Sequence, residues 1–185
     1  MQIESKEKIR ERLLTLLRTQ KEEDRVKKSR SVLKRLFAIP EFQQSRTVLF
    51  YAAFGGEVET SEMIEQAQNL GKKIALPIIL RDQKKLKPSL VKNLTKELET
   101  GPYGVLQPRE SARALSLTEI DVVVVPGVAF DRQNRRLGRG AGYYDRLLSD
   151  FPPDTPTFGL AFDFQLVDIL PHQEHDVPVS RVIIN

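Results

Sequence analysis

Apolar and charged positions alternate over the first forty residues with the period of an α-helix. Apolar side chains recur every three or four positions in two groups, which are Ile9, Leu13, Leu16 and Leu17, then Val26, Leu33, Leu36 and Phe37. Most of the remaining positions are Lys, Arg or Glu, so each segment has one apolar face and one charged face. Pro40 closes the segment because proline cannot continue a helix. The pattern predicts two amphipathic helices over residues 4–38.

After residue 46 the pattern changes to alternating strands and helices. We expect a strand at Thr47–Ala53, a helix N-capped by Thr60 that runs to Leu70, and a strand at Lys73–Leu80. Gly71 stands where a helix C-cap is expected. Pro77 lacks a backbone N–H, which favours a strand end or a sheet edge. Residues 81–110 are rich in Lys, Pro and Gly, and we expect them to be irregular with a short edge hairpin.

The second half of the chain carries the strongest strand signal. Asp121–Val125 contains four consecutive valines, which is typical of a strand buried on both faces in a parallel sheet. The elements that follow are a helix around Tyr143–Leu148, a strand at Thr157–Phe162, a short helix at Gln165–Leu170 and a final strand at Arg181–Ile184. This order predicts one three-layer α/β domain over residues 1–185, Rossmann-like, with a mostly parallel central sheet. The helical pair at 1–38 is expected to pack on it.

Composition and charge narrow the possible chemistry. The 185 residues carry 29 basic and 25 acidic side chains, a net charge of +4, which suits a polyanionic small molecule as well as a nucleic acid. Without cysteine there are no disulfides and no thiolate sites, and two histidines argue against a zinc centre. Any metal is therefore expected to be a hard ion with oxygen ligands. The chain shows neither a signal peptide nor an apolar run of membrane-spanning length, so we expect a cytoplasmic protein without a membrane partner.

The loop after the valine strand concentrates the residues that could bind an anion. It reads Pro126-Gly-Val-Ala-Phe-Asp131 and, four residues later, Arg136-Leu-Gly-Arg-Gly-Ala-Gly-Tyr-Tyr-Asp145. Ligands of open parallel sheets bind beyond the carboxyl ends of the strands. The three glycines let backbone N–H groups approach a ligand, and the following helix start favours negative charge. The arginines offer forks for phosphate oxygens, the tyrosines offer flat faces, and the aspartate offers a ligand for Mg²⁺.

Two interpretations of this loop remain open from its residue pattern. It could be a glycine-rich turn before an ordinary helix, or an anion or nucleotide site. The arginines, tyrosines and aspartate around the glycines favour the second. The spacing matches neither the P-loop nor the Rossmann fingerprint.

These residues resemble the signature of the 5-formyltetrahydrofolate cyclo-ligases. Three further stretches agree in order and spacing, namely Lys6 to Arg10, Gly56-Glu57-Val58-Glu59-Thr60, and Gly159–Gln165 with His175-Asp176-Val177-Pro178. The resemblance covers essentially the whole chain. It implies an ATP- and Mg²⁺-dependent ligase of folate one-carbon metabolism that converts 5-formyltetrahydrofolate into 5,10-methenyltetrahydrofolate. In that reaction the formyl oxygen is phosphorylated by ATP, N10 attacks the activated carbon, and ADP and phosphate are released.

The resemblance also implies a role for individual residues. Those implied to bind ATP are Lys6, Arg10, Arg136, Leu137, Gly138, Arg139, Gly140, Ala141, Gly142, Tyr143 and Tyr144. Those implied to bind the folate are Ala52, Glu57, Arg139, Gly140, Ala141, Gly142 and Tyr143. Arg139 and Tyr143 are the implied catalytic residues, and Asp145 and Asp176 the implied Mg²⁺ ligands. Lys6 and Arg10 are four residues apart and share a helix face, which without the resemblance would suggest only a solvated charged face.

Two positions depart from the family pattern. Asn134 stands where glycine is usual, and Asn tolerates the left-handed conformation better than most residues. Gln107 replaces a commoner glutamate and receives no catalytic role. His175 is expected to position its loop rather than to ligate metal.

Two other classes of function have to be weighed against the cyclo-ligase. A sugar-phosphate isomerase or coenzyme A transferase has a similar scaffold, but would need a base or a glutamate nucleophile and no ATP. A nucleic-acid-binding module is suggested by charge alone. We expect a monomer that binds 5-formyltetrahydrofolate and ATP and no nucleic acid.

Overall fold

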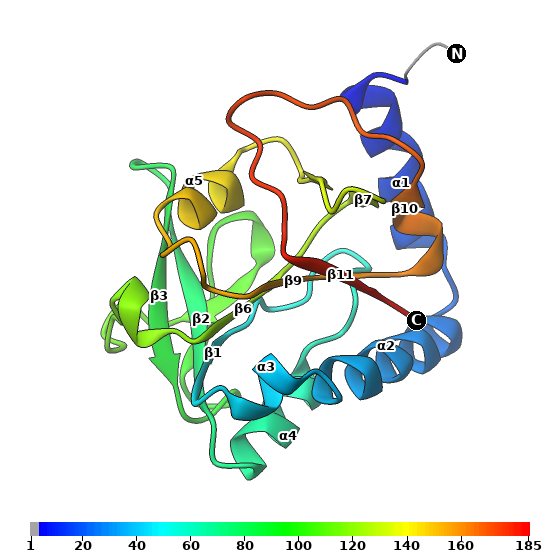
Figure 1. Cartoon of the computed structure of the whole chain (residues 1–185). Coiled ribbons are helices and arrows are strands. Elements are labelled where there is room, and N and C mark those ends of the chain that lie inside the picture. Colours follow the sequence, from blue (N-terminus) through cyan, green and yellow to red (C-terminus); the bar gives the residue numbers. More distant parts are fainter. Residues whose placement is uncertain (1–3) are drawn as a thin grey trace.

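The computed structural model describes residues 4–185, and its centre is a six-stranded sheet (Figure 1). The strand order is β11–β9–β6–β1–β2–β3. The bounds are β1 Thr47–Leu49, β2 Lys73–Leu80, β3 Lys85–Val91, β6 Val122–Val125, β9 Thr157–Ala161 and β11 Arg181–Ile184. All neighbouring pairs are parallel except β2 and β3, which are antiparallel. The prediction of an α/β fold with a mostly parallel central sheet is confirmed.

Helices pack against both faces of the sheet. Figure 1 shows α2 (Glu22–Phe37), α3 (Pro40–Gln44) and α4 (Ser61–Asn69) along one side and α5 (Tyr143–Ser149) on the other. The valines of β6 alternate between the two sides. Val122 and Val124 belong to the apolar cluster that includes α2 and α4, whereas Val123 and Val125 belong to the cluster that includes α5. Because successive side chains of a strand point to opposite faces, a continuous valine run suits this strand.

The two N-terminal helices form close to their predicted bounds and pack against different parts of the fold. α1 (Lys6–Thr19) buries Ile9 and Leu13 in a small cluster with Leu137. α2 instead packs against the main sheet through Val32 and Leu36. In Figure 1, α1 stands beside β7 and β10 while α2 runs along the sheet. Consequently α1 lies close to the loop that follows the valine strand.

Several predicted elements have different bounds in the structure. The first strand ends at Leu49 rather than Ala53, and Pro40 begins the short helix α3 instead of only ending a helical segment. Thr60 is the helix N-cap as predicted, but its hydroxyl donates to the Tyr51 carbonyl oxygen instead of capping. The helix ends at Asn69 with Leu70 as its C-cap, so Gly71 lies one residue beyond the cap that was predicted for it. Gly71 has the left-handed φ of +81° that favours glycine after a helix.

The segment predicted to be irregular contains a full antiparallel strand. β3 pairs with β2 from Ile74 opposite Val91 to Leu80 opposite Lys85, so β2 is not at the sheet edge. β1 pairs with β2 only as far as Ala75. Pro77 lies beyond that point, so its missing N–H does not interrupt the hydrogen bonds between β1 and β2. The expected short hairpin is present as β4 (Leu98–Thr100) and β5 (Leu106–Pro108), joined by the 3₁₀ turn η1 (Pro102–Gly104).

The helix predicted at Gln165–Leu170 is wrong. A 3₁₀ turn, η3 (Asp163–Gln165), leads into the short strand β10 (Leu166–Val167), which joins β7 (Ala129–Asp131) and β8 (Arg136–Leu137) in a second small sheet. Side chains hold this segment extended. The buried Gln165 amide donates to the Gly127 carbonyl oxygen at 2.8 Å, and an Asp131 carboxylate oxygen accepts from the Leu170 N–H at 3.1 Å.

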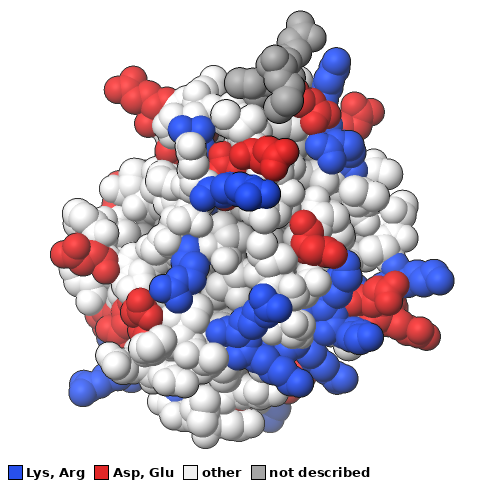
Figure 2. Space-filling view, turned by 45° about the vertical axis from the view of Figure 1, so that its right-hand side comes forward, with Lys and Arg blue, Asp and Glu red and all other residues white. Residues whose placement is uncertain are grey.

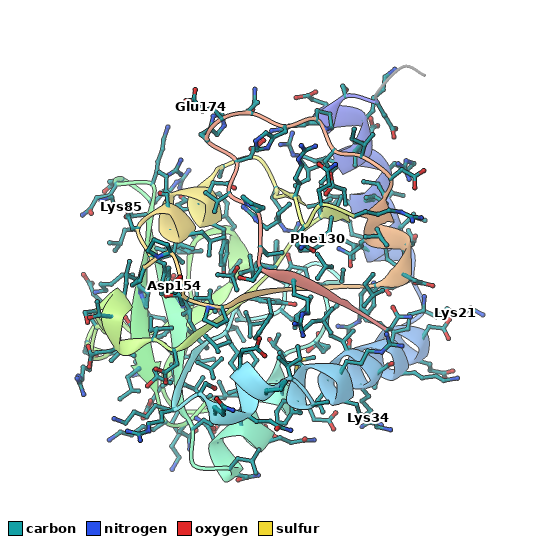
Figure 3. All side chains as sticks on the ribbon, in the orientation of Figure 1. Lys21, Lys34, Lys85, Phe130, Asp154 and Glu174 are labelled. Atoms are coloured by element: carbon teal, nitrogen blue, oxygen red, sulfur yellow. The ribbon has the colours of Figure 1, made fainter. Side chains whose placement is uncertain are left out.

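Phe130 of β7 packs between the small sheet (β10–β7–β8) and the central six-stranded sheet. Its ring is fully buried, and Figure 3 shows it labelled in the interior of the molecule. A Cβ atom on Gly127 or Gly159 would lie 2.5 or 2.4 Å from a ring carbon, so glycine at both positions makes room for the ring. Another 3₁₀ turn, η2 (Leu117–Glu119), precedes β6. No helix within residues 4–185 is long and apolar enough to cross a membrane.

Candidate functional site

A cavity of about 500 Å³ opens beyond the carboxyl ends of β1 and β6. Its walls come from the segment after β1, the loop after β6, one face of α1 and the loop at 173–176. This is the position where open parallel sheets bind ligands. Every residue implied to bind ATP, folate or metal lines this cavity: Lys6, Arg10, Ala52, Glu57, Arg136, Leu137, Gly138, Arg139, Gly140, Ala141, Gly142, Tyr143, Tyr144, Asp145 and Asp176.

The glycine-rich loop requires all three of its alternating glycines. Gly140 and Gly142 have φ values of +112° and +68°, in the region that side chains disfavour, and Gly142 directly precedes α5. A Cβ atom on Gly138 would lie 2.7 Å from a guanidinium nitrogen of Arg136. At these three positions the loop therefore exposes its backbone to the cavity.

Arg136 lies beneath this loop, with a side chain only 3% exposed. One guanidinium nitrogen is 2.9 Å from a carboxylate oxygen of Asp145, and the guanidinium also lies 5.7 Å from the Tyr144 ring centre. Another nitrogen donates to the Pro126 carbonyl oxygen at 3.4 Å. Arg136 thus connects the start of the loop to Asp145 at its end. These contacts hold the loop in place at the cavity wall.

Arg139 reaches across the cavity to Glu57. Its Nε and one Nη lie 3.1 and 3.0 Å from the same carboxylate oxygen, and that Nη also donates to the Phe54 carbonyl oxygen. The guanidinium sits 4.4 Å from the centre of the Phe54 ring. Burial raises the pKa of Glu57 above its ordinary value, and Arg139 and the Phe54 N–H lower it without cancelling that rise.

Tyr51, which is buried, and Tyr144, which is half-buried, complete the wall around Glu57. Burial, reinforced by the nearby Glu57 charge, raises the pKa of both Tyr51 and Tyr144. Their hydroxyls stay protonated at neutral pH and act as hydrogen-bonding groups. Tyr51 already donates to the Val58 carbonyl oxygen at 2.9 Å, which fixes the loop that carries Glu57.

α1 brings two cations to the opposite wall. Lys6 Nζ lies 2.5 Å from a carboxylate oxygen of Asp176, and Arg10 Nε donates to the Gly138 carbonyl oxygen at 2.9 Å. Burial raises the pKa of Asp176, but hydrogen bonds from Lys6 and from the Gln173 N–H outweigh it, so the net pKa is below the ordinary value. The shared helix face predicted for Lys6 and Arg10 is thus turned toward the cavity.

The two predicted metal ligands belong to neighbouring segments. The N–H of Val177, next to Asp176, donates to a carboxylate oxygen of Asp145 at 3.3 Å. Among residues 4–185 no three His, Cys, Asp or Glu side chains cluster as a metal cage. Mg²⁺ commonly takes one or two carboxylates together with substrate phosphate oxygens, and this pair fits such a site. His175 is mostly exposed, with its Nε2 4.0 Å from Asp176.

The sequence did not single out an aromatic and apolar wall that the structure adds. Tyr103 belongs to η1, within the segment predicted to be irregular, and its hydroxyl lies 3.5 Å from that of Tyr143. Tyr51 and Phe54 flank Ala52 just after β1, where their position at a strand end could have indicated them. The other members are Pro77, Ile79, Leu86, Val105 and Leu106.

The structure shows what the two residues that depart from the family pattern, Asn134 and Gln107, do in the fold. Asn134 adopts φ +59°, which confirms the expected left-handed turn. Gln107 is buried, and its side-chain oxygen accepts from the Ile79 N–H at 3.0 Å. It joins β5 to the end of β2 and does not line the cavity.

Comparisons with known proteins agree on one family. The model of the 5-formyltetrahydrofolate cyclo-ligase family matches residues 2–185. The chain is 34% identical over 158 residues to the 5-formyltetrahydrofolate cyclo-ligase of Escherichia coli K12, which covers 80% of this chain and 83% of that protein. A probable 5-formyltetrahydrofolate cyclo-ligase of Caenorhabditis elegans is 30% identical over 190 residues, covering 97% and 92%.

A solved structure supports the same relationship. The NMR structure of Aquifex aeolicus 5,10-methenyltetrahydrofolate synthetase superposes with a TM-score of 0.84 at 31% identity, covering 97% of this chain and 89% of that one. A 5,10-methenyltetrahydrofolate synthetase from Mycoplasma pneumoniae has the same fold, with a TM-score of 0.79 at 21% identity.

Proposed function

The chain belongs to the 5-formyltetrahydrofolate cyclo-ligase family. We therefore propose that its cavity binds ATP beside 5-formyltetrahydrofolate and that the protein catalyses closure of the folate ring there. The protein is accordingly a ligase of folate metabolism. The assignment of the site rests on one observation: a single cavity has one wall rich in cations and backbone groups and another that is aromatic and apolar. Lys6, Arg10 and the glycine loop supply cations and backbone groups suited to a triphosphate. Tyr51, Phe54 and the apolar residues opposite suit a flat heterocycle.

The first step transfers the γ-phosphoryl group of ATP to the formyl oxygen. A bond forms between that oxygen and the γ-phosphorus, the bond to the bridging oxygen breaks, and ADP leaves. Positioning and charge neutralisation carry most of such a step. Lys6, Arg10 and Arg139 provide the positive charge. Asp145 and Asp176 would hold Mg²⁺, which when bound neutralises charge on the phosphates.

The second step closes the ring. N10 attacks the activated formyl carbon and loses its proton, and the carbon–oxygen bond breaks so that the formyl oxygen leaves within inorganic phosphate. Phosphate is a far better leaving group than the oxygen of a formamide, which explains why the reaction consumes ATP. Tyr143 and Arg139 lie where the glycine loop meets the folate wall, and we assign them to the reacting groups.

Glu57 is assigned to folate recognition. It is 9% exposed, it points into the cavity, and its carboxylate is a natural acceptor for the N–H edge of a pterin. In this structure Glu57 pairs with Arg139, which lies between the cationic wall and the aromatic wall of the cavity. We propose that Arg139 shifts toward the phosphates when ATP binds and leaves Glu57 to the folate.

The assay for this proposal follows the methenyl chromophore while the protein is incubated with 5-formyltetrahydrofolate, Mg²⁺ and ATP. We expect turnover that stops when ATP is omitted; no signal at high protein concentration would overturn the proposal. Glu57→Ala is expected to raise the KM for the folate more than that for ATP, and an equal rise of both would contradict the role of Glu57. The single domain, the cytoplasmic location, the monomeric state and the lack of nucleic-acid binding stay predictions.

A further inference from the structure

The turn that carries Glu57 lies against the C-terminal end of α1. This turn consists of residues 54–57, and within it Gly55 and Gly56 have φ values of +60° and +85°. A Cβ atom on Gly56 would lie 2.0 Å from the Leu17 carbonyl oxygen, so the turn packs directly on the last turn of the helix. Two successive glycines allow many backbone conformations unless other contacts restrict them. The position of Glu57 in the cavity therefore depends on contacts from outside the turn.

Among residues 4–185, hydrogen bonds reach this turn from two side chains, Arg139 and Gln20. Arg139 donates to the Glu57 carboxylate and to a backbone carbonyl oxygen of the turn. Gln20 is the C-cap residue of α1, and its Nε2 donates to the Gly56 carbonyl oxygen at 2.8 Å and to the Leu17 carbonyl oxygen at 3.0 Å. The Gln20 side chain thus connects the turn to the end of the helix.

The residues that follow the turn are held by α2. The hydroxyl of Ser29 accepts from the Glu59 N–H at 3.0 Å, and the Glu59 carboxylate pairs with Arg25. Figure 2 turns the right-hand side of Figure 1 forward and shows Asp and Glu among the Lys and Arg gathered over the lower part of that face. The contacts with α2 begin two residues beyond Glu57, so they leave the turn itself to Arg139 and Gln20.

Gln20 acts from outside the cavity. It is half-buried and does not line the cavity, and Figure 3 labels the next residue, Lys21, where α1 meets α2. Its side-chain oxygen is buried without a hydrogen-bond partner among the described residues. An unpaired buried acceptor lowers stability. The favourable contribution of this side chain therefore comes from its amide nitrogen, which holds the turn.

We propose that Gln20 is a positioning residue that holds the 54–57 turn after Arg139 has moved to the ATP phosphates, so that Glu57 meets the folate from a fixed position. This inference rests on the proposed function, in which Arg139 leaves Glu57 when ATP binds. Without nucleotide, both side chains hold the turn. With nucleotide, Gln20 supplies the remaining hydrogen bond from outside the turn.

Replacing Gln20 with methionine is expected to weaken folate binding mainly when nucleotide is bound. Methionine is unbranched and of similar length, but it donates no hydrogen bond. One net hydrogen bond changes an equilibrium constant by about 2- to 12-fold. We expect the Kd for 5-formyltetrahydrofolate to rise about 3- to 10-fold with nucleotide present and less than about twofold without it.

Isothermal titration calorimetry with 5-formyltetrahydrofolate tests the proposal. Each protein is titrated with and without Mg²⁺ and adenylyl imidodiphosphate, an ATP analogue that does not transfer its γ-phosphoryl group. Gln20→Lys is expected to keep wild-type affinity, because an ammonium group can donate to both carbonyl oxygens and is favoured at a helix C-terminus. The matched control is Gln43→Met, which removes an amide that donates to the Phe37 carbonyl oxygen at 3.0 Å on α3, before β1. It is expected to bind like wild type.

The affinity for the analogue alone reports on the other end of α1. Lys6 and Arg10 lie there, so Gln20→Met is expected to change this affinity by less than about twofold. An equal loss of folate and nucleotide affinity would show general damage to the helix and would overturn the inference.

Three other results would also overturn it: wild-type folate affinity of Gln20→Met with the analogue present, the same loss with and without the analogue, or no recovery in Gln20→Lys. Because binding is measured without turnover, a nucleotide-dependent loss in a protein that forms no methenyl product would contradict the proposed reaction and still support the role of Gln20. A protein that forms the product but shows no such loss would contradict the role of Gln20 alone.

Discussion

Replacing Arg139 with alanine is expected to destabilise the protein more at alkaline than at acidic pH. The substitution removes two hydrogen bonds, of 3.1 and 3.0 Å, from a carboxylate that is 9% exposed. The Phe54 N–H, 3.2 Å from the other oxygen of Glu57, remains. Glu57 then has to be buried either as a charge without its cation or as a neutral acid.

The structure sets the magnitude of this effect. Removing one partner of a fully buried pair costs about 3–5 kcal/mol, but the Arg139 side chain is 30% exposed and water can enter its place. We therefore expect a loss of about 1–3 kcal/mol near pH 8. Protonation of Glu57 removes most of that cost, so we expect the loss near pH 5.5 to be smaller than the loss near pH 8.

The sign follows from the direction of the pKa shift. Burial already raises the pKa of Glu57 above its ordinary 4.5, and loss of Arg139 raises it further. Between the ordinary value and the raised native value the folded protein holds a proton that the unfolded chain has released, so stability falls as pH rises through this window. The window extends to higher pH in the variant, and the difference from wild type grows with pH.

Urea unfolding followed by circular dichroism at the two pH values measures this difference. The control compares the Glu57→Gln/Arg139→Ala double variant with the Glu57→Gln single variant. Neither has a carboxylate at position 57 to titrate, so removal of Arg139 should cost the same at both pH values. An Arg139→Ala loss that is equal at both pH values would refute the reasoning that Arg139 compensates a buried Glu57 charge.

Substitutions at three further positions test the site and the fold. Asp145→Ala is expected to lower kcat by about 100-fold or more while the protein stays folded, since it removes a proposed metal ligand and frees Arg136; wild-type turnover would refute the assignment. Gly159→Ala puts a Cβ atom 2.4 Å from Phe130 and should cost about 1–3 kcal/mol in urea unfolding, and an unchanged midpoint would show that the ring moves aside. Asn134→Val should cost about 1–2 kcal/mol at its left-handed φ and Asn134→Gly almost nothing, whereas equal effects would contradict the turn geometry.

The sequence was most informative where one local pattern fixes both structure and position. The valine run 122–125 predicted a strand buried on two faces, and the glycine repeat after it favoured a loop that exposes its backbone; the structure has both. The strand β3 was missed because lysines and prolines lower strand propensity, while pairing with the whole length of β2 outweighs that preference.

The partnerships inside the site could not be read from the sequence. Arg139 and Glu57 are 82 residues apart, and Lys6 and Asp176 are 170 residues apart. No periodic or local signal links such positions, and only the family resemblance placed them in one site. The resemblance could not show that Arg136 is buried under the loop, because this depends on how Asp145 and Tyr144 pack around it.

Tracing the formyl oxygen tests the central claim most directly. The wild-type protein is incubated with ATP, Mg²⁺ and 5-formyltetrahydrofolate labelled with ¹⁸O in the formyl group, and the inorganic phosphate is analysed by mass spectrometry. Phosphorylation of the formyl oxygen predicts one labelled oxygen in each phosphate released, in step with methenyl formation. Product formed with unlabelled phosphate, and with the label in water, would contradict the mechanism proposed for this cavity.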